Sequence, residues 1–410
     1  MSRYCHSVGS RARTPPSEQR YLVRGRSLVG RIVRIGQVRV QEPSRFASAT
    51  GDTETTTAQP PKAMAFFGRK KLTVGLDVGS GLVKAVVIDH TSGTPELTKV
   101  VVTPLNDTAI VEGEVMDHAI VADAIRQTLD ATGVKTKHVV SAVGGRDVIV
   151  KKIQIERVKE AQARELMRWE AEQHVPFDME SVELDFQILD PDADGLEMSV
   201  LLVAAKRDLV EAKRGLLTDG GAPPSIIDVD AFALHNAFEM NHPDAMEGTV
   251  ALLNIGNEAT NLNILDDGVP ILTRDLTVGT RRFREDLQRE HGIGNDEAEA
   301  MIRGFDRHPA LDGVVSMRGE EIAIGMERAA TFLATSSRNF GQIRAVYACG
   351  GGARVPGLLP WLSERLRMPV QLANPLARVS VREGAMEFLS TDEVAPLLML
   401  PVGLALRAAA

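Results

Sequence analysis

Cysteine and aromatic residues are scarce in this sequence of 410 residues. Its two cysteines, Cys5 and Cys349, stand far apart and without metal-ligand spacing, which argues against a disulfide framework or a zinc module and fits a reduced cytosolic protein. Aromatic residues make up 4% of the chain, so we expect a mostly aliphatic core. Because no run of eighteen apolar residues occurs, we expect no membrane-spanning helix.

Basic residues are concentrated at the N-terminus. Residues 1–63 carry a net charge of about +7, and the remainder carries about −15. Because phosphate binding needs basic surface, the acidic body argues against nucleic acid as the main ligand. Residues 1–70 have the composition of a disordered extension, for which three interpretations stay open: a transit peptide, a basic arm, or material upstream of a true start at Met64. We leave this segment out of the fold prediction.

Hydrophobic patterning after residue 70 predicts alternating strands and helices. A helix is expected before Gly133, and a second, amphipathic helix is expected before Pro176. Two paired strands, a further helix and another strand are predicted at 181–190, 197–206, 207–222 and 225–230.

One pattern occurs twice. "LTVGLDVGSGLVKAVVID", residues 72–89, is a strand, a glycine turn and a second strand. The same form returns about 175 residues later in "TVALLNIGNEATNLNILDD", residues 249–267. Two copies of one supersecondary unit predict two similar lobes that face each other across a cleft. A third glycine turn, Gly350 to Gly352, follows a strand and precedes an expected helix.

The first turn has the composition of a phosphate site. Glycine permits backbone N–H groups to converge on an anion, so Gly79, Ser80 and Gly81 are candidates to bind terminal phosphates. Lys84 adds a positive charge, and Asp77 is a candidate to hold hydrated Mg²⁺.

The other two turns extend this interpretation. Gly256, Asn257 and Thr260 are expected to close over the same phosphates from the second lobe, and the third turn suits a nucleoside or its α-phosphate. Any single turn is explained by a tight hairpin, whereas three in this strand context favour a nucleotide site. A dinucleotide fold is excluded because its glycine motif joins a strand to a helix.

These turns resemble the phosphate and adenosine motifs of the actin and hexokinase ATPase superfamily. "EAEQHVPFDMESVELDFQIL", "IIDVDAFALHNAFE" and "PVGLALR" are further similar, in order, to the family of the type IV pilus assembly protein PilM. The resemblance covers about residues 70–407.

The resemblance implies an α/β fold of two lobes around a nucleotide cleft, with an inserted subdomain like that of the cell-division protein FtsA. It implies ATP and Mg²⁺ as cofactors and a position at the cytoplasmic face of the inner membrane. The implied partners are the N-terminal cytoplasmic tail of PilN, held between the insertion and the first lobe's core, and the inner-membrane complex and pilus motors.

The expected organisation is as follows. After the extension at 1–70, the first lobe's core occupies 71–146, the insertion 147–225 and a connection 226–248, before the second lobe at 249–348 and a C-terminal return at 349–407. The expected nucleotide-site residues are Gly79, Ser80, Gly81, Lys84, Gly256, Asn257, Thr260, Gly279, Glu299, Gly350, Gly351 and Gly352.

The sequence departs from the superfamily pattern at two positions. Asn254 stands where hydrolysing members usually carry Asp, and a neutral amide neither acts as a base nor offers a full charge to a metal. Asp77 and Asn254 are thus the only catalytic candidates, and we expect weak or absent hydrolysis. Ile302 stands where relatives often have Lys, which leaves Glu299 as the acidic match beside the nucleoside.

Two other function classes stay open: an active ATPase or kinase, and a filament-forming protein like FtsA. Among single residues, His174 is interpreted as a packing or surface histidine and Cys349 as a small buried residue. Trp169 and Phe177 fit either partner binding or packing of the subdomain. The segment after Gly279 and Thr280 is expected to begin a helix at the back of the second lobe.

Overall fold

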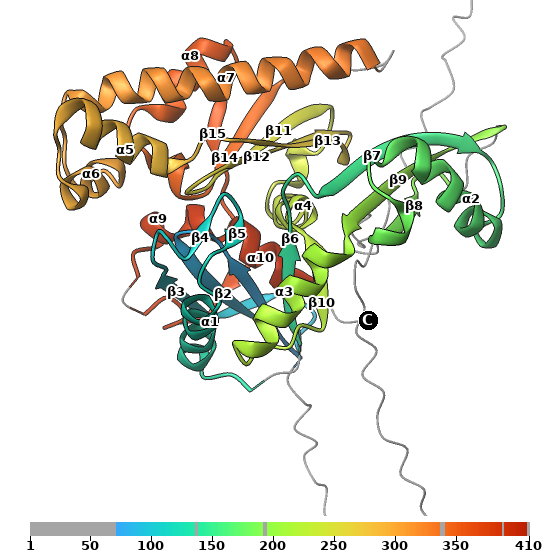
Figure 1. Cartoon of the computed structure of the whole chain (residues 1–410), viewed down its shortest axis with the longest axis horizontal. Coiled ribbons are helices and arrows are strands. Elements are labelled where there is room, and N and C mark those ends of the chain that lie inside the picture. Colours follow the sequence, from blue (N-terminus) through green and yellow to red (C-terminus); the bar gives the residue numbers. More distant parts are fainter. Residues whose placement is uncertain (1–70, 136–137, 192–194, 337–340, 388, 408–410) are drawn as a thin grey trace, which may run out of the picture.

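A computed structural model describes residues 71–407 apart from 136–137, 192–194, 337–340 and 388 (Figure 1). The extension at 1–70, with its three interpretations, lies outside the described residues. Within the described part of the chain, none of the helices combines the length and the apolar composition that crossing a bilayer requires.

The first lobe is built on a six-stranded sheet with the order β10-β6-β1-β2-β3-β16. Its strands β1, β2 and β3 are antiparallel, and β6 and β10 continue the sheet parallel to β1. Their bounds are Leu72–Val78 (β1), Leu82–Asp89 (β2), Glu96–Pro104 (β3), Val139–Val143 (β6), Ile226–Val229 (β10) and Ser380–Val381 (β16). A small hairpin of Ile110–Val111 (β4) and Glu114–Val115 (β5) precedes the first helix.

The second lobe repeats this topology. Its sheet has the order β13-β12-β11-β14-β15, with an antiparallel meander of β11, β12 and β13 followed by two parallel strands. The bounds are Thr249–Ile255 (β11), Thr260–Asp266 (β12), Val269–Leu276 (β13), Ala345–Cys349 (β14) and Val370–Leu372 (β15). The two-lobe α/β prediction from the repeated sequence pattern is therefore confirmed.

Helices cover both sheets. In the first lobe they are His118–Thr132 (α1), Arg207–Asp219 (α3), Asp230–Asn241 (α4), Thr391–Val394 (α9) and Met399–Leu406 (α10). In the second lobe they are Thr280–His291 (α5), Asn295–Ile302 (α6), Ala310–Ser336 (α7) and Leu358–Leu366 (α8). Short 3₁₀ turns occupy Met179–Ser181, Pro243–Ala245, Gly351–Arg354 and Ala395–Leu398.

Local signals set the limits of α1. Asp117 accepts a hydrogen bond from the Ile120 N–H at 3.0 Å, and Gly133 ends the helix in the left-handed conformation. Both ends follow from the sequence, because a short carboxylate side chain satisfies an N–H that the first turn leaves unpaired, and glycine adopts positive φ without strain.

The joint between the lobes is a shared apolar core. It combines one face of the first-lobe sheet, the helices α4 and α10, and residues of β11 such as Val250 and Leu252. The C-terminal helix α10 is almost completely buried, as expected of a core element. It lies so close to its neighbours that a Cβ at Gly75 would overlap the Pro401 carbonyl oxygen, and one at Gly403 would overlap that of Ala233.

The insertion is a three-stranded sheet, β7-β9-β8, with one helix (Figure 1). Its elements are Val148–Glu156 (β7), Glu160–His174 (α2), Val182–Ile188 (β8) and Glu197–Lys206 (β9). The sequence pattern predicted β8, β9 and α2 but not β7. In β9, Leu201 and Val203 pack against β10 and α4, whereas Val200 and Leu202 pack beneath α2. The helix α3, expected within the interval 147–225, instead places Leu216 and Leu217 in the first-lobe core beside α1.

Candidate functional site

The first glycine turn joins β1 to β2. The Gly79 N–H donates to the Leu82 carbonyl oxygen at 3.0 Å, whereas the N–H groups of Ser80 and Gly81 have no acceptor among the described residues. Beside the turn, Lys84 Nζ lies 2.5 Å from Asp77 Oδ2 in a largely buried ion pair. Two free N–H groups and an ammonium, which suit phosphate oxygens, are thus gathered beside a carboxylate that suits a hydrated cation.

The second glycine turn is held by the start of α5. The Thr280 and Arg281 N–H groups donate to the carbonyl oxygens of Gly256 and Asn257 at 3.0 and 2.8 Å. A Cβ at Gly279 would overlap the Asn257 carbonyl, so only glycine permits this close approach. Gly279 therefore positions the turn.

The two turns meet where the lobes face each other. Asn257 Nδ2 donates to the Ser80 hydroxyl at 3.4 Å, and a Cβ at Gly81 would lie 3.3 Å from Asn257 Cγ. The sequence expected these residues to face one another, and they do. Phosphates placed between the turns require the lobes to part at this contact.

Two expected nucleotide-site residues have their side chains engaged elsewhere. The Thr260 hydroxyl is fully buried and donates to the Val278 carbonyl oxygen at 2.7 Å. Glu299 Oε2 accepts from Arg284 Nη1 at 3.0 Å. Thr260 thus supports the turn from behind, while Glu299 belongs to an ion-pair group at the cleft mouth.

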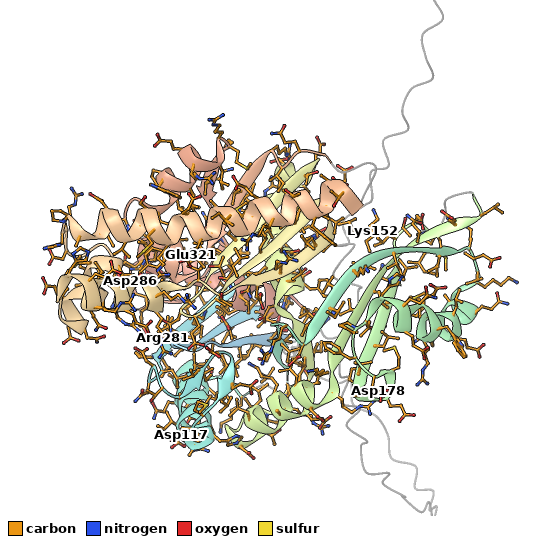
Figure 2. All side chains as sticks on the ribbon, turned by 45° about the horizontal axis from the view of Figure 1, so that its top comes forward. Asp117, Lys152, Asp178, Arg281, Asp286 and Glu321 are labelled. Atoms are coloured by element: carbon orange, nitrogen blue, oxygen red, sulfur yellow. The ribbon has the colours of Figure 1, made fainter. Side chains whose placement is uncertain are left out.

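That ion-pair group corrects the expectation for the helix after Gly279. The helix α5 faces the first lobe and not the back of the molecule, because Arg284 Nη2 reaches Asp107 of the first lobe at 2.6 Å. The neighbouring Arg281 lies where the lobes meet and pairs with Glu258 at 2.8 Å (Figure 2). The many charges at the start of α5 did not predict which way these side chains face, because their partners in the other lobe are distant in sequence.

The third glycine turn packs against the end of β11. Gly350 has φ of 84°, and a Cβ at either Gly350 or Gly352 would overlap Ile255. The Gly350 N–H donates to the Pro396 carbonyl oxygen at 2.7 Å. A 3₁₀ turn follows directly, and the helix α8 begins only at Leu358. Close packing thus accounts for Gly350 and Gly352, and Gly351 remains partly exposed.

Asp230 is a cleft residue that sequence reasoning missed. It opens α4 directly after β10, and a Cβ at Gly144 would overlap its carboxylate. Burial and the neighbouring Asp77 raise its pKa to about 7, against an opposing effect of Lys213. Burial lowers the Lys213 pKa. The available signal was an acidic residue directly after the buried strand β10.

Asn254 lies in a row of polar side chains across the second-lobe sheet. Its Nδ2 donates to Asn261 Oδ1 at 3.0 Å, and Asn261 Nδ2 donates to Asp275 Oδ1 at 2.6 Å. Burial raises the Asp275 pKa, and the bond from Asn261 opposes that shift. The amide at 254 is thus a hydrogen-bond donor within the sheet.

The remaining single residues behave largely as interpreted. His174 is half-buried beside Lys151, and burial followed by that charge lowers its pKa. Burial raises the Cys349 pKa to about 12, which makes it an inert core thiol. No group of metal-ligating residues was found in the described part of the chain. Trp169 is exposed.

The insertion carries a cavity of about 490 Å³ between α2 and the strand β8. Its lining combines apolar side chains with three arginines and two acidic residues, Arg164, Arg168, Arg207, Glu180 and Asp185. Arg164 lies over the Phe186 ring at 5.8 Å. The expected groove between the insertion and the first lobe's core stays a prediction. Apolar side chains fill the part of that boundary where β9 packs on β10.

These residues suit a nucleoside triphosphate with Mg²⁺. Lys84 engages one Asp77 oxygen, and the other is available to waters of a hydrated cation. The free N–H groups of Ser80 and Gly81 suit phosphate oxygens. Mg²⁺ supplies neutralisation of the phosphate charge when bound.

The repeated lobes, the inserted sheet and the facing glycine turns define an actin-like protein of the α/β class. Residues 75–409 match the family described as type IV pilus assembly protein PilM. This match spans more than half of the chain, and the chain belongs to that family.

Solved structures agree with this assignment. A structure described as the PilM-PilN type IV pilus biogenesis complex is 27% identical, with a TM-score of 0.71, covering 82% of this chain and 98% of that one. The ethanolamine utilization protein EutJ from Carboxydothermus hydrogenoformans is 18% identical, with a TM-score of 0.51, covering 85% and 90% of the two chains. The second likeness concerns the fold alone.

Proposed function

We propose that the protein is a nucleotide-binding adaptor of type IV pilus assembly. It binds Mg-ATP between its lobes with little or no hydrolysis, and it captures the N-terminal cytoplasmic tail of PilN. In this way it couples the inner-membrane complex to the pilus motors from a peripheral position at the membrane. The observation that carries the nucleotide part is the meeting of Ser80 and Asn257 beside the Asp77–Lys84 pair.

Each proposed nucleotide contact has a source in the chain. The N–H groups of Ser80 and Gly81 and the ammonium of Lys84 bind phosphate oxygens, and Asp77 orients the hydrated cation. Low turnover follows from Asn254, which offers no base and whose amide is engaged with Asn261.

We place the partner tail in the cavity between α2 and β8. A short peptide needs an apolar pocket with a few polar anchors, and this cavity offers Met167 and Phe186 together with arginine and acidic side chains. The strand β8 is an edge of its sheet, so an extended tail can also pair with its backbone. Support for PilN as the tail's owner comes from the family and from the complex that resembles this chain.

The test is a calorimetric titration of the purified protein with a PilN-tail peptide, with and without Mg-ATP, while phosphate release is followed in the same samples. We expect tail binding with negligible release. The variant Arg168→Glu should weaken tail binding about tenfold or more, because it reverses a charge in the cavity lining. Arg328→Glu, an exposed arginine of α7 on the second lobe, is the matched control and should leave it unchanged.

The other outcomes separate the alternatives. Steady phosphate release without tail binding would replace the adaptor by an active ATPase. Polymers that form with nucleotide would favour a filament protein. Unchanged tail binding in Arg168→Glu would exclude the cavity as the binding site of the tail and would still agree with the adaptor role.

A further inference from the structure

A row of polar side chains crosses the second-lobe sheet near the cleft. Asn254, Asn261 and Asp275 lie directly opposite one another on the neighbouring strands β11, β12 and β13. Two hydrogen bonds, of 3.0 and 2.6 Å, join them in sequence. Such cross-strand pairs fix the positions of their strands relative to one another.

The hydrogen bonds of this row all run in one direction. The carboxylate of Asp275 accepts, so Asn261 must turn its NH₂ group toward it and its oxygen toward β11. Asn254 must then present its own NH₂ group to Asn261. An aspartate at 254 lacks this donor, so the residue that departs from the superfamily pattern is the one that the row requires.

Each end of the row touches a functional part of the molecule. At one end, Asn254 lies beside the third glycine turn, where the Cys349 thiol is 3.7 Å from Asn254 Oδ1. At the other end, a Cβ at Gly145 would lie 3.9 Å from Asp275 Oδ2. Gly145 belongs to the link that leads into the insertion, and β13 lies alongside β7 (Figure 1).

We propose that Asn254, Asn261 and Asp275 act as positioning residues that transmit the state of the nucleotide cleft to the root of the insertion. This inference rests on the proposed nucleotide binding. Its consequence is that nucleotide alters the conformation of the link at 144–147 and of β7, and through them the affinity of the insertion for its partner.

The row moves as a unit for an energetic reason. A nucleotide that parts Ser80 from Asn257 shifts the ends of β11 and β12, on which Asn254 and Asn261 lie. If their partners stayed in place, these partly buried polar groups would lose their hydrogen bonds. Asp275 therefore follows, and Gly144 and Gly145, which have no side chains to resist the movement, absorb it.

The experiment is hydrogen–deuterium exchange on the full chain, with and without Mg-ATP, and with nucleotide binding measured separately by calorimetry. In the wild type we expect nucleotide to change exchange over residues 144–156 by about fivefold or more. In Asn261→Leu, which removes both hydrogen bonds of the row, we expect nucleotide still to bind and the change at 144–156 to disappear.

Thr273→Val is the matched control. Thr273 also lies on β13, but it faces Asn263 at 3.4 Å and not the row. It should keep the wild-type response. If Mg-ATP binds to the wild type and exchange at 144–156 does not change, the inference is overturned, as it is if Asn261→Leu retains the full response. If Mg-ATP does not bind at all, the proposed function itself fails, and calorimetry shows this independently.

Discussion

Arg284 of the second lobe holds Asp107 of the first lobe across the cleft mouth at 2.6 Å, and its other nitrogen binds Glu299. This bridge therefore holds the two lobes together at one point. We predict that Asp107→Asn speeds both association and release of a fluorescent ATP analogue roughly threefold, since a partly exposed ion pair stabilises closure by about 1 kcal/mol or less. Stopped-flow fluorescence measures both rates.

The control for this bridge is Asp123→Asn. This variant breaks an ion pair with Arg126 within α1 and does not alter a contact between the lobes. Equal rates in the wild type and Asp107→Asn would show that the bridge does not limit entry.

A second prediction concerns Asn254→Asp. Restoring the superfamily carboxylate supplies the base that Asn254 lacks, so phosphate release should rise, but an aspartate cannot donate to Asn261 as Asn254 does. Stability should fall by roughly 1 kcal/mol, because a partly buried polar group loses its hydrogen bond. Phosphate release and urea unfolding measure the two effects. Unchanged phosphate release, or a gain in release at unchanged stability, would contradict this account.

The pH dependence of stability provides a third prediction, through His235. This side chain is fully buried, and its ring nitrogen Nε2 bonds the Gly268 carbonyl oxygen at 2.8 Å. Burial lowers its pKa from 6.5 to about 4, so it folds as the neutral form. The unfolded chain therefore binds a proton at this histidine more readily than the folded chain. The free energy of unfolding is unaffected by this group above pH 6.5 and decreases as the pH falls from 6.5 toward 4.

We expect this residue to account for up to about 3 kcal/mol of that loss. Urea unfolding across the range should show a shallower fall in His235→Gln, which keeps a hydrogen-bonding group and does not titrate. Parallel curves for the two proteins would exclude His235 as the cause.

A fourth prediction compares two glycines. A Cβ at Gly403 would overlap the Ala233 backbone where α10 crosses α4, so Gly403→Ala should cost roughly 3 kcal/mol or more. Gly313 lies within α7 with open space around it, and Gly313→Ala should stabilise the protein by about 0.5–1 kcal/mol. Chemical denaturation separates the two, and destabilisation of equal size would show that the crossing is not tight.

Much of the fold was predictable because local sequence patterns determine many of its helices, strands and turns. The repeat of strand, glycine turn and strand at 72–89 and 249–267 predicted two similar lobes, and Gly133 marked the end of α1. The strand β7 was missed because "VIVKKIQIE" follows a glycine pair and alternates with exposed lysines, a weak signal beside the charged helix that follows.

The site was predictable only in part. Glycine turns can be recognised in the sequence. The prediction therefore placed Ser80 and Asn257 opposite one another, and they are in contact in the structure. The positions of several other residues depend on which strands become neighbours and which lobe faces a helix. These are Asp230, Arg284 and the row from Asn254 to Asp275. Such long-range placement leaves no periodic mark on the sequence.

The central claim is that the facing turns bind Mg-ATP without appreciable turnover. Calorimetry with Mg-ATP on the wild type, Lys84→Met and Lys99→Met tests it most directly, with phosphate release assayed in parallel. Lys99 is the control, because it lies on β3 away from the turns and pairs with Glu387. We predict one bound nucleotide, a loss of about tenfold or more in affinity for Lys84→Met alone, and negligible phosphate release. Equal affinity in all three proteins, or rapid phosphate release by the wild type, would contradict the account.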